Sequence, residues 1–435
     1  MRARGRLSGW ALACAVVAGG LTACGNAGQQ VTHSGNTDGV FADRIVLGAL
    51  ASETGPLPAD FAPVVTGAQV YLDMVNAAGG VNGRKLDLAY TLDDQSSPSV
   101  NASQARTLVE QDHVFAVVAV ATPSFSGGTF LAENSVPTFG LNVNAQWMAG
   151  PTMFGNNGSF LDFASPQLQA VFLAEQHHVH AAAVLAYNIS QSRQGCQGVL
   201  NGFHRYGIPV AFEDLSIPAP ATDLHADVNR MKKAGVDMVV SCMDLSGNVL
   251  VSQTMRQQAL TGVVQLWNNG YDESALNQYR QAMQGAYFFQ PNVPFEVTSL
   301  WPGRYPGMDL FQKMLRRYAP GTKPSQAALA GWTGADLFVT GLRAIGRDVT
   351  RQRLVAAINK ITSFTAGGIL APVDWTSAHT SAGPINCSAY VQVQGARFVP
   401  VYGTGSSVFV CFPVPDPAAA PIRPVTPVPA GVPPT

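Results

Sequence analysis

Short, unbroken apolar runs alternate with amphipathic stretches along most of this chain, and that alternation limits the fold more than any other feature. The runs at residues 45–50, 115–121 and 181–187 have strand length and lack polar alternation. Strands that are apolar on both sides must be covered on both sides, which is typical of parallel sheets flanked by helices. We therefore predict an α/β fold built on parallel sheets.

The alternation occurs twice, which indicates two α/β units of similar size. In the first unit we expect strands at 45–50, 86–92, 115–121 and 136–141, and helices over 62–78 and 99–111. In the second we expect strands at 181–187, 209–212, 238–242 and 263–267, and helices near 194–206, 223–234 and 246–260. A strand at 287–290, a mostly helical segment over 308–361 and a hairpin of 389–394 with 397–402 complete the ordered chain.

Composition and motifs exclude several classes of function. With 435 residues, 47% of them hydrophobic, the chain is long enough for a large core, and wholesale disorder is excluded. A net charge of -1 does not suggest a face for nucleic acid. No phosphate loop, His-Glu-x-x-His pair or Gly-x-Ser-x-Gly elbow is present, so we expect no enzyme, no catalytic residues and no cofactor. His177-His178-Val179-His180 follows a helix end, where His is favourable without a metal, and we expect no metal site.

The first residues have the pattern of an export signal. Arg2, Arg4 and Arg6 precede an apolar stretch, residues 10–20, that is too short to span a bilayer. The stretch ends in Leu21-Thr22-Ala23-Cys24, which resembles the lipobox of bacterial lipoproteins, whose Cys thiol carries lipid. We expect residues 1–23 to be a signal peptide, Cys24 to be lipidated and residues 24–40 to be a flexible tether. The alternative is a plain secretory signal in which Cys24 has no role.

The other end of the chain is rich in proline and has no apolar periodicity. We predict that residues 413–435 form an extended, disordered tail.

Residues 67–94, GAQVYLDMVNAAGGVNGRKLDLAYTLDD, resemble the first helix and second strand of type I periplasmic binding proteins. The most similar branch is the leucine/isoleucine/valine-binding group that serves ABC importers, and residues 76–86 are the most specific part of the match. Supporting similarities are LASETGP at 50–56, KKAGVDMVV at 232–240 and GGILAPVDW at 367–375.

The resemblance implies two Rossmann-like lobes with parallel sheets, joined by a three-crossover hinge. The N-lobe would comprise residues 41–153 and 286–363, and the C-lobe residues 154–285 and 364–412. A small solute would bind between the lobes, at the carboxyl ends of strands, and the lobes would close around it.

The function implied by the resemblance is that of an extracytoplasmic solute-binding lipoprotein of an ABC importer. The solute would be a branched-chain amino acid or a related small polar compound, and the protein partner would be an ABC permease. We expect a monomer that is lipid-anchored to the outer face of the cytoplasmic membrane. A ligand-sensing or scaffold lipoprotein with the same clamp fold and no transport role is the alternative.

Polar residues follow two N-lobe strands. Thr122, Ser124 and Ser126 match the turn that the family uses for the solute carboxylate, and N-capping of the next helix is their alternative role. Asn142 and Asn144 match the second contact loop, where the family commonly has a small residue and a hydroxyl; an ordinary polar turn is the alternative. Nearby, Phe61 after Asp60 either walls the pocket or is a hydrophobic staple.

Candidate ligand contacts also follow the C-lobe strands. They are Asn188, Asp244, Asn269, Tyr271 and Asp272. In the family, aromatic and acidic residues occupy the loops that here contain Asp244 and residues 269–272. An acid in either loop would bind an ammonium group of the solute. Capping of the following helix is the alternative for Asp244 and for Asp272, and the sequence favours it.

Of the six cysteines, Cys14 lies in the signal and Cys24 is the expected lipid attachment site, so the body of the protein has four. An even number in an exported protein allows three pairings. Cys387 and Cys411 flank the final hairpin and are expected to form a disulfide. Cys196 and Cys242 form either a second bridge or two buried thiols.

Overall fold

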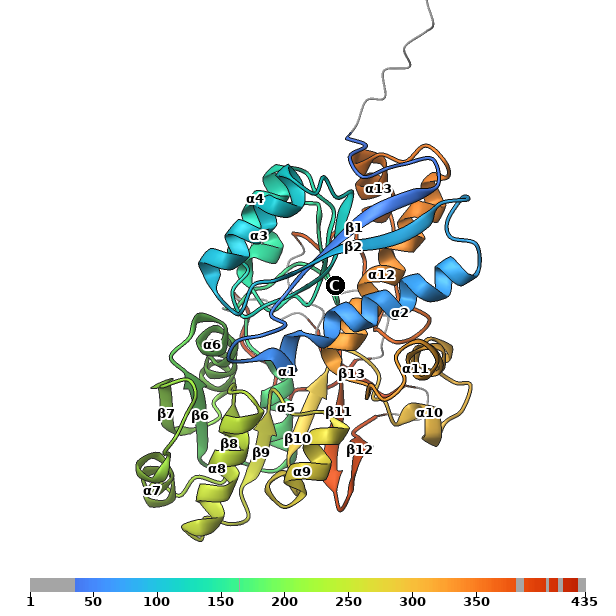
Figure 1. Cartoon of the computed structure of the whole chain (residues 1–435). Helices are drawn as coiled ribbons and strands as arrows, with labels where there is room; N and C mark the ends of the chain where they lie inside the picture. Colours follow the sequence, from blue (N-terminus) through green and yellow to red (C-terminus); the bar gives the residue numbers. More distant parts are fainter. Residues whose placement is uncertain (1–35, 164, 381–386, 404–406, 414–417, 429–435) are drawn as a thin grey trace, which may run out of the picture. The chain divides into compact units, whose positions relative to one another are not determined.

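Two sheets, each flanked by helices, organise the computed structural model (Figure 1). The structure describes residues 36–163, 165–380, 387–403, 407–413 and 418–428. The expected signal peptide, Cys24 and most of the tether lie outside the described residues.

The N-lobe sheet has five parallel strands in the order β2-β1-β3-β4-β5. These are β1 Arg44–Ala51, β2 Lys85–Asp93, β3 Ala116–Ala121, β4 Thr138–Gly140 and β5 Met153–Gly155. Between them lie α1 Pro58–Phe61, α2 Pro63–Ala77, α3 Pro98–Glu110, α4 Gly128–Glu133 and a 3-10 helix, Ala145–Met148. Strand β3 is buried along its whole length and β1 along nearly all of it, which explains their unbroken apolar sequences.

Helices from late in the chain complete this lobe. They are α10 Val297–Leu300, α11 Pro306–Tyr318, α12 Gln326–Ile345 and α13 Arg351–Ile358. Helix α12 lies directly against α2, as the orange and blue helices of Figure 1 show. A Cβ atom on Gly67 would overlap the carbonyl oxygen of Ala328, and a Cβ atom on Gly331 would overlap the carbonyl oxygen of Val64. Glycine is therefore required where the backbones of α2 and α12 touch.

The C-lobe sheet has the order β12-β11-β10-β9-β8-β6-β7, with β13 beside β11. Its strands are β6 Ala182–Tyr187, β7 Val210–Ile217, β8 Met238–Ser241, β9 Val264–Trp267, β10 Tyr287–Gln290, β11 Cys387–Gln394, β12 Arg397–Val401 and β13 Phe409–Cys411. Strands β6 to β10 pair in parallel, and β11 pairs antiparallel with β10, β12 and β13. The helices are α5 Leu168–Gln176, α6 Ser190–Tyr206, α7 His225–Lys233, α8 Leu245–Gln257 and α9 Glu273–Met283.

The chain passes between the lobes after β5, after β10 and between α13 and β11, and these passages differ from the expected boundaries. Strand β10 pairs with β9 and β11, so the second passage follows residue 290 rather than residue 285. Phe364, Ile369 and Trp375 pack in the same hydrophobic cluster as the N-lobe strands β1 and β3, although the expected boundary assigns this segment to the C-lobe. The second passage comes later than expected because β10 completes a sheet whose other parallel strands begin far earlier in the sequence.

Residues 418–428 are the described part of the proline-rich tail, and the prediction of disorder is wrong for them. Val425 is buried in the C-lobe core, and its amide donates to a carboxylate oxygen of Glu175 (2.6 Å). Arg423 pairs with the same carboxylate (2.8 Å), and the Val428 amide donates to the Cys411 carbonyl (2.8 Å). Proline prevents helix formation but leaves neighbouring amides and side chains able to dock on a folded surface.

Arg351 connects the returning helices to the N-lobe sheet. Its side chain is only 1% exposed. The guanidinium donates from Nε to the Phe115 carbonyl (2.9 Å) and from Nη2 to the Val114 carbonyl (2.6 Å), both directly before β3. One buried cation therefore donates to two backbone acceptors just before β3.

We expect Arg351→Met to destabilise the protein by roughly 3 kcal/mol, because two buried carbonyls would lose their donor. Urea unfolding measures this difference. Arg353→Met is the matched control, since Arg353 is half-exposed and pairs only with exposed groups such as Asp348, and it should cost less than about 0.5 kcal/mol. Equal losses in the two variants would contradict a structural role for the buried guanidinium.

Candidate functional site

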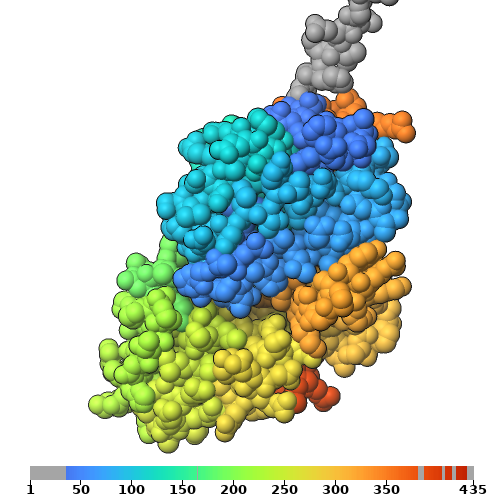
Figure 2. Space-filling view, in the orientation of Figure 1, coloured from blue at the N-terminus to red at the C-terminus, as the bar shows by residue number. Residues whose placement is uncertain are grey.

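A cavity of about 830 Å³ has walls from both lobes. Asp60, Phe61 and Asn142 contribute from the N-lobe, and Tyr187 and Asp244 are among the C-lobe residues. Figure 2 shows the two lobes on one face of the molecule, with the N-terminal part in blue above the green and yellow C-lobe. The volume is within the range of small-molecule sites, about 300–1,000 Å³.

The structure brings five of the ten predicted ligand contacts into the lining of this cavity. These are Asn142, Asp244, Asn269, Tyr271 and Asp272. The other five do not line it: Thr122, Ser124, Ser126, Asn144 and Asn188. Ligand contact stays a prediction for both groups.

The hydroxyl turn after β3 is engaged with its own loop. Thr122 is buried, and its hydroxyl accepts a bond from the Ser124 amide (3.2 Å). The Asn144 side chain donates to the Pro123 carbonyl (3.1 Å), which joins this turn to the loop after β4. No hydroxyl of this turn caps α4, whose N-cap residue is Gly127, so the predicted alternative of N-capping is not observed in this turn.

Asp244 and Asp272 cap helices and also line the cavity. Asp244 accepts from the Gly247 amide at the start of α8 (2.9 Å) and from the Tyr187 hydroxyl (2.5 Å). Asp272 accepts from the Ala275 amide at the start of α9 (2.8 Å). The sequence offered helix capping and ligand contact as alternatives for these acids. The structure shows that one carboxylate can cap a helix and still line the cavity.

Tyr271 joins the C-lobe to the segment that follows the second passage. Its ring stacks on Phe295, with centroids 5.2 Å apart and an interplanar angle of 7°. Its hydroxyl donates to the Glu296 carboxylate (2.5 Å) and accepts from the Phe295 amide (2.7 Å). Burial raises the pKa of Glu296 to about 7. These contacts fix the position of a cavity wall relative to the hinge.

Asp60 faces the two C-lobe acids from the N-lobe. Burial raises the pKa of Asp60 to about 7, and the charges of Asp244 and Asp272 add to the rise. The sequence left the role of the neighbouring Phe61 open. The structure places Phe61 in the cavity wall beside Asp60.

Several lining residues had no signal in the sequence. Asp162, Gln167 and Phe289 lie at or near the passages between lobes, and Lys323 lies between α11 and α12. Lys323 pairs with Glu273 at 3.3 Å. Their place at the cavity follows from the return of the chain and not from a local motif.

Two disulfides flank the site. The structure joins Cys387 to Cys411 and Cys196 to Cys242, so the second pair, left open by the sequence, is a bridge. Cys242 and Cys387 both line the cavity. The bridges thus hold the ends of β8 and β11, from which cavity residues extend.

We expect the unliganded protein to lose stability as pH rises through the range in which Asp60 ionises. The pKa of Asp60 is about 7 in the folded protein and about 3.9 in an unfolded chain. Between these values the folded state holds the extra proton, so the free energy of unfolding falls as pH rises from about 4 and the loss is complete above about 7. Asp60→Asn should remove this loss and be more stable than the parent by on the order of 2 kcal/mol at pH 8.

Urea unfolding at pH 5 and pH 8, without solute, measures that difference. Asp87→Asn is the control, because Asp87 is exposed on β2 and does not line the cavity. The pKa of Glu296 is also raised, so the stability of Asp60→Asn should still fall as pH rises, but less steeply than that of the parent protein. A gain that is equal at the two pH values would show that ionisation of Asp60 is not its source.

Comparison with known proteins identifies the family. A family model described as periplasmic binding protein matches residues 44–397. The Leu/Ile/Val-binding protein homolog 3 of Brucella melitensis is 27% identical over 220 residues, which cover 47% of this chain and 55% of that protein. The chain thus matches about half the length of this curated relative.

Solved structures share the fold at low sequence identity. A solute-binding protein of an ABC transporter from R. palustris, in complex with benzoate, has a TM-score of 0.69 at 16% identity and covers 85% of this chain and 98% of its own. A fatty acid ABC transporter substrate-binding protein from Thermomonospora curvata has 0.68 at 17%, with 83% and 93% covered. A leucine-binding protein from Thermotoga maritima has 0.67 at 17%, with 82% and 97% covered.

These matches confirm the predicted α/β fold with two parallel-sheet lobes and the resemblance to type I periplasmic binding proteins. Because the family model spans most of the sequence, this chain belongs to the periplasmic binding protein family.

Proposed function

We propose that this protein is the solute-binding component of an ABC importer and that its lobes close around a small polar solute. The observation that carries the proposal is the cavity of about 830 Å³ with walls from both lobes. A solute that contacts both walls binds the closed form better than the open form, so binding itself drives closure. The family membership and the solute-binding relatives support this role.

The solute class predicted from the sequence is a branched-chain amino acid or a related compound. The curated relative is named for leucine, isoleucine and valine, whereas similar structures are described with benzoate or fatty acid. The cavity combines apolar side chains such as Leu161 and Phe289 with amides such as Asn142 and Asn269. This mixture suits a small solute that has both an apolar part and hydrogen-bonding groups.

Export and anchoring are part of the proposal. The basic start, the apolar stretch and Cys24 support a signal peptide with lipid attached to that thiol. Two disulfides in the body of the protein support a location outside the reducing cytosol. Among the helices that the structure describes, none has the length and apolar character needed to cross a membrane. We propose a monomer at the outer face of the cytoplasmic membrane, with an ABC permease as its partner.

Replacing Cys24 by Ser should release the protein from the membrane, because the thiol that carries lipid is gone. Cell fractionation with radiolabelled palmitate measures both the location and the label. Cys14→Ser, within the expected signal peptide, is the control and should leave both unchanged. Retention of label in the Cys24→Ser protein would exclude this residue as the lipidation site.

A solute should raise the melting temperature of the purified protein, because it binds the folded state alone. At a concentration about 1,000 times Kd the gain is about 4 kcal/mol, which corresponds to several degrees. The screen should include amino acids, amides, amines and aromatic acids. Ser274→Trp, which places a large ring in the cavity from an exposed position on α9, should abolish the shift.

Ser299→Trp is the matched control, because Ser299 is also exposed but does not line the cavity. It should leave the solute-induced shift intact. If no solute raises the melting temperature, the receptor function is contradicted. Co-purification with a permease and its ATPase tests the transport role against sensing alone.

A further inference from the structure

The interlobe cavity is lined by carboxylates from both sides. Asp60 comes from the N-lobe, Asp162 from the first passage, and Asp244 and Asp272 from the C-lobe. Within the described lining, Lys323 is the one basic side chain, and its charge is paired with Glu273 (3.3 Å). A ligand in this cavity therefore meets an excess of negative charge.

Two of the helix N-termini that could bind an anion at this cavity already hold a carboxylate. A helix N-terminus is a natural site for a carboxylate, and α8 and α9 both begin at this cavity. Asp244 caps α8 and Asp272 caps α9. Each carboxylate accepts a hydrogen bond from a backbone amide of its helix. The hydroxyl turn at 122–126 does not line the cavity, and the described lining contains no Arg or His. An anionic solute would therefore find like charge at these two helix N-termini. The start of α6, whose residues Ile189, Gln191 and Ser192 line the cavity, has no side-chain cap and is the one uncharged alternative among these three helices.

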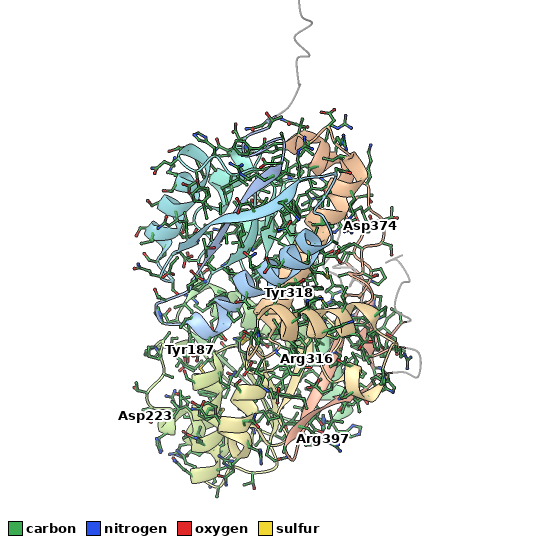
Figure 3. All side chains as sticks on the ribbon, turned by 45° about the vertical axis from the view of Figure 1, so that its right-hand side comes forward. Tyr187, Asp223, Arg316, Tyr318, Asp374 and Arg397 are labelled. Carbon is green, nitrogen blue, oxygen red and sulfur yellow. A yellow bond between two sulfur atoms is a disulfide. The ribbon has the colours of Figure 1, made fainter. Side chains whose placement is uncertain are left out.

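Aromatic rings accompany the carboxylates. Tyr187 is held beside Asp244 by a 2.5 Å hydrogen bond, and Phe61 follows Asp60 in the wall. Figure 3 places Tyr187 at the junction of the blue N-lobe and the green and yellow C-lobe. Ring faces attract cations, and more strongly in a site shielded from water. The rings and the acids thus favour the same kind of ligand.

The like charges that face one another across the cavity also indicate what effect a bound cation would have. The pKa of Asp60 rises to about 7 through burial and then through the charges of Asp244 and Asp272, so these acids repel one another across the cavity. A positive group between them replaces repulsion by attraction in the closed form. No group of three His, Cys, Asp or Glu in the described chain is close enough to hold a metal ion.

We infer that this cavity takes a solute with a net positive charge, an amine or ammonium compound without a free carboxylate. The inference rests on the proposed solute-binding function and narrows its ligand class. Asp60 and the two capping aspartates, Asp244 and Asp272, hold the positive group, and the aromatic walls hold the rest of the solute.

Isothermal titration calorimetry on the full-length protein tests this with solutes matched in shape and different in charge. The pairs are choline with 3,3-dimethyl-1-butanol and putrescine with 1,4-butanediol, with spermidine, L-leucine and benzoate as further probes. We expect a cation to bind at least about 10-fold more tightly than its uncharged partner. Binding should weaken as salt is raised, because exposed parts of the field are screened.

Two variants locate the charge. Asp60→Asn and Asp272→Asn should each weaken cation binding by about 10-fold or more, and Asn at 272 still caps α9. Asp223→Asn is the matched control, because Asp223 lies on the C-lobe outside the cavity (Figure 3) and should leave Kd unchanged. Melting curves of the same proteins show whether a loss of binding is a loss of folding, and Asp60→Asn is expected to melt no lower than the parent.

Two outcomes would overturn the inference, and they can be told apart. Binding of L-leucine or benzoate in preference to the cations, with Asp60→Asn neutral or favourable, would reject the charge class and leave the receptor function standing. Absence of binding by every probe, whatever its charge, would reject the charge class and count against the receptor function as well.

Discussion

The burial of β1 and β3 on both faces is the constraint on which the rest of the structure depends. These strands have no polar face, so helices must cover each side of the N-lobe sheet. Helix α2 supplies part of one cover, but α12, more than 250 residues later, completes it through backbone contact at Gly67 and Gly331. The chain must therefore leave the N-lobe, build the C-lobe and return. The passages between lobes and the cavity beside them are consequences of that return.

The sequence predicts the elements that are long and uniform, and it fails where a partner defines the element. Strands β3 and β6 are recognisable because each is an unbroken apolar run. Strands β5 and β13 have three residues each and exist because a neighbouring strand pairs with them. The same reason places β10 in the C-lobe sheet, and it explains why Val428 of the tail finds the Cys411 carbonyl. Pairing partners far apart in sequence leave no local pattern.

The candidate site likewise contains some residues that the sequence predicts and others that it does not. Asp244 and Asp272 follow strands and precede helices, so their position at the carboxyl edge of the sheet could be predicted from the alternation alone. Lys323 and Phe289 reach the cavity through the return of the chain, which no neighbouring residue reveals. The hydroxyl turn had a clear match in the sequence, but Thr122 is buried within its own loop outside the cavity lining, so its contact with a ligand stays a prediction.

Capping and charge are linked in this cleft, and the link bears on how the clamp works. An Asp at the start of α8 or α9 stabilises its helix, but it also fills the anion site that the helix start would offer. Asp60 then faces both acids from the other lobe, at a cost to the unliganded protein that grows as it ionises. Such a cost opposes closure when the cleft is empty and disappears when a ligand neutralises it. Under the proposed function, the interaction that weakens the empty clamp would therefore be the one that makes closure depend on the ligand.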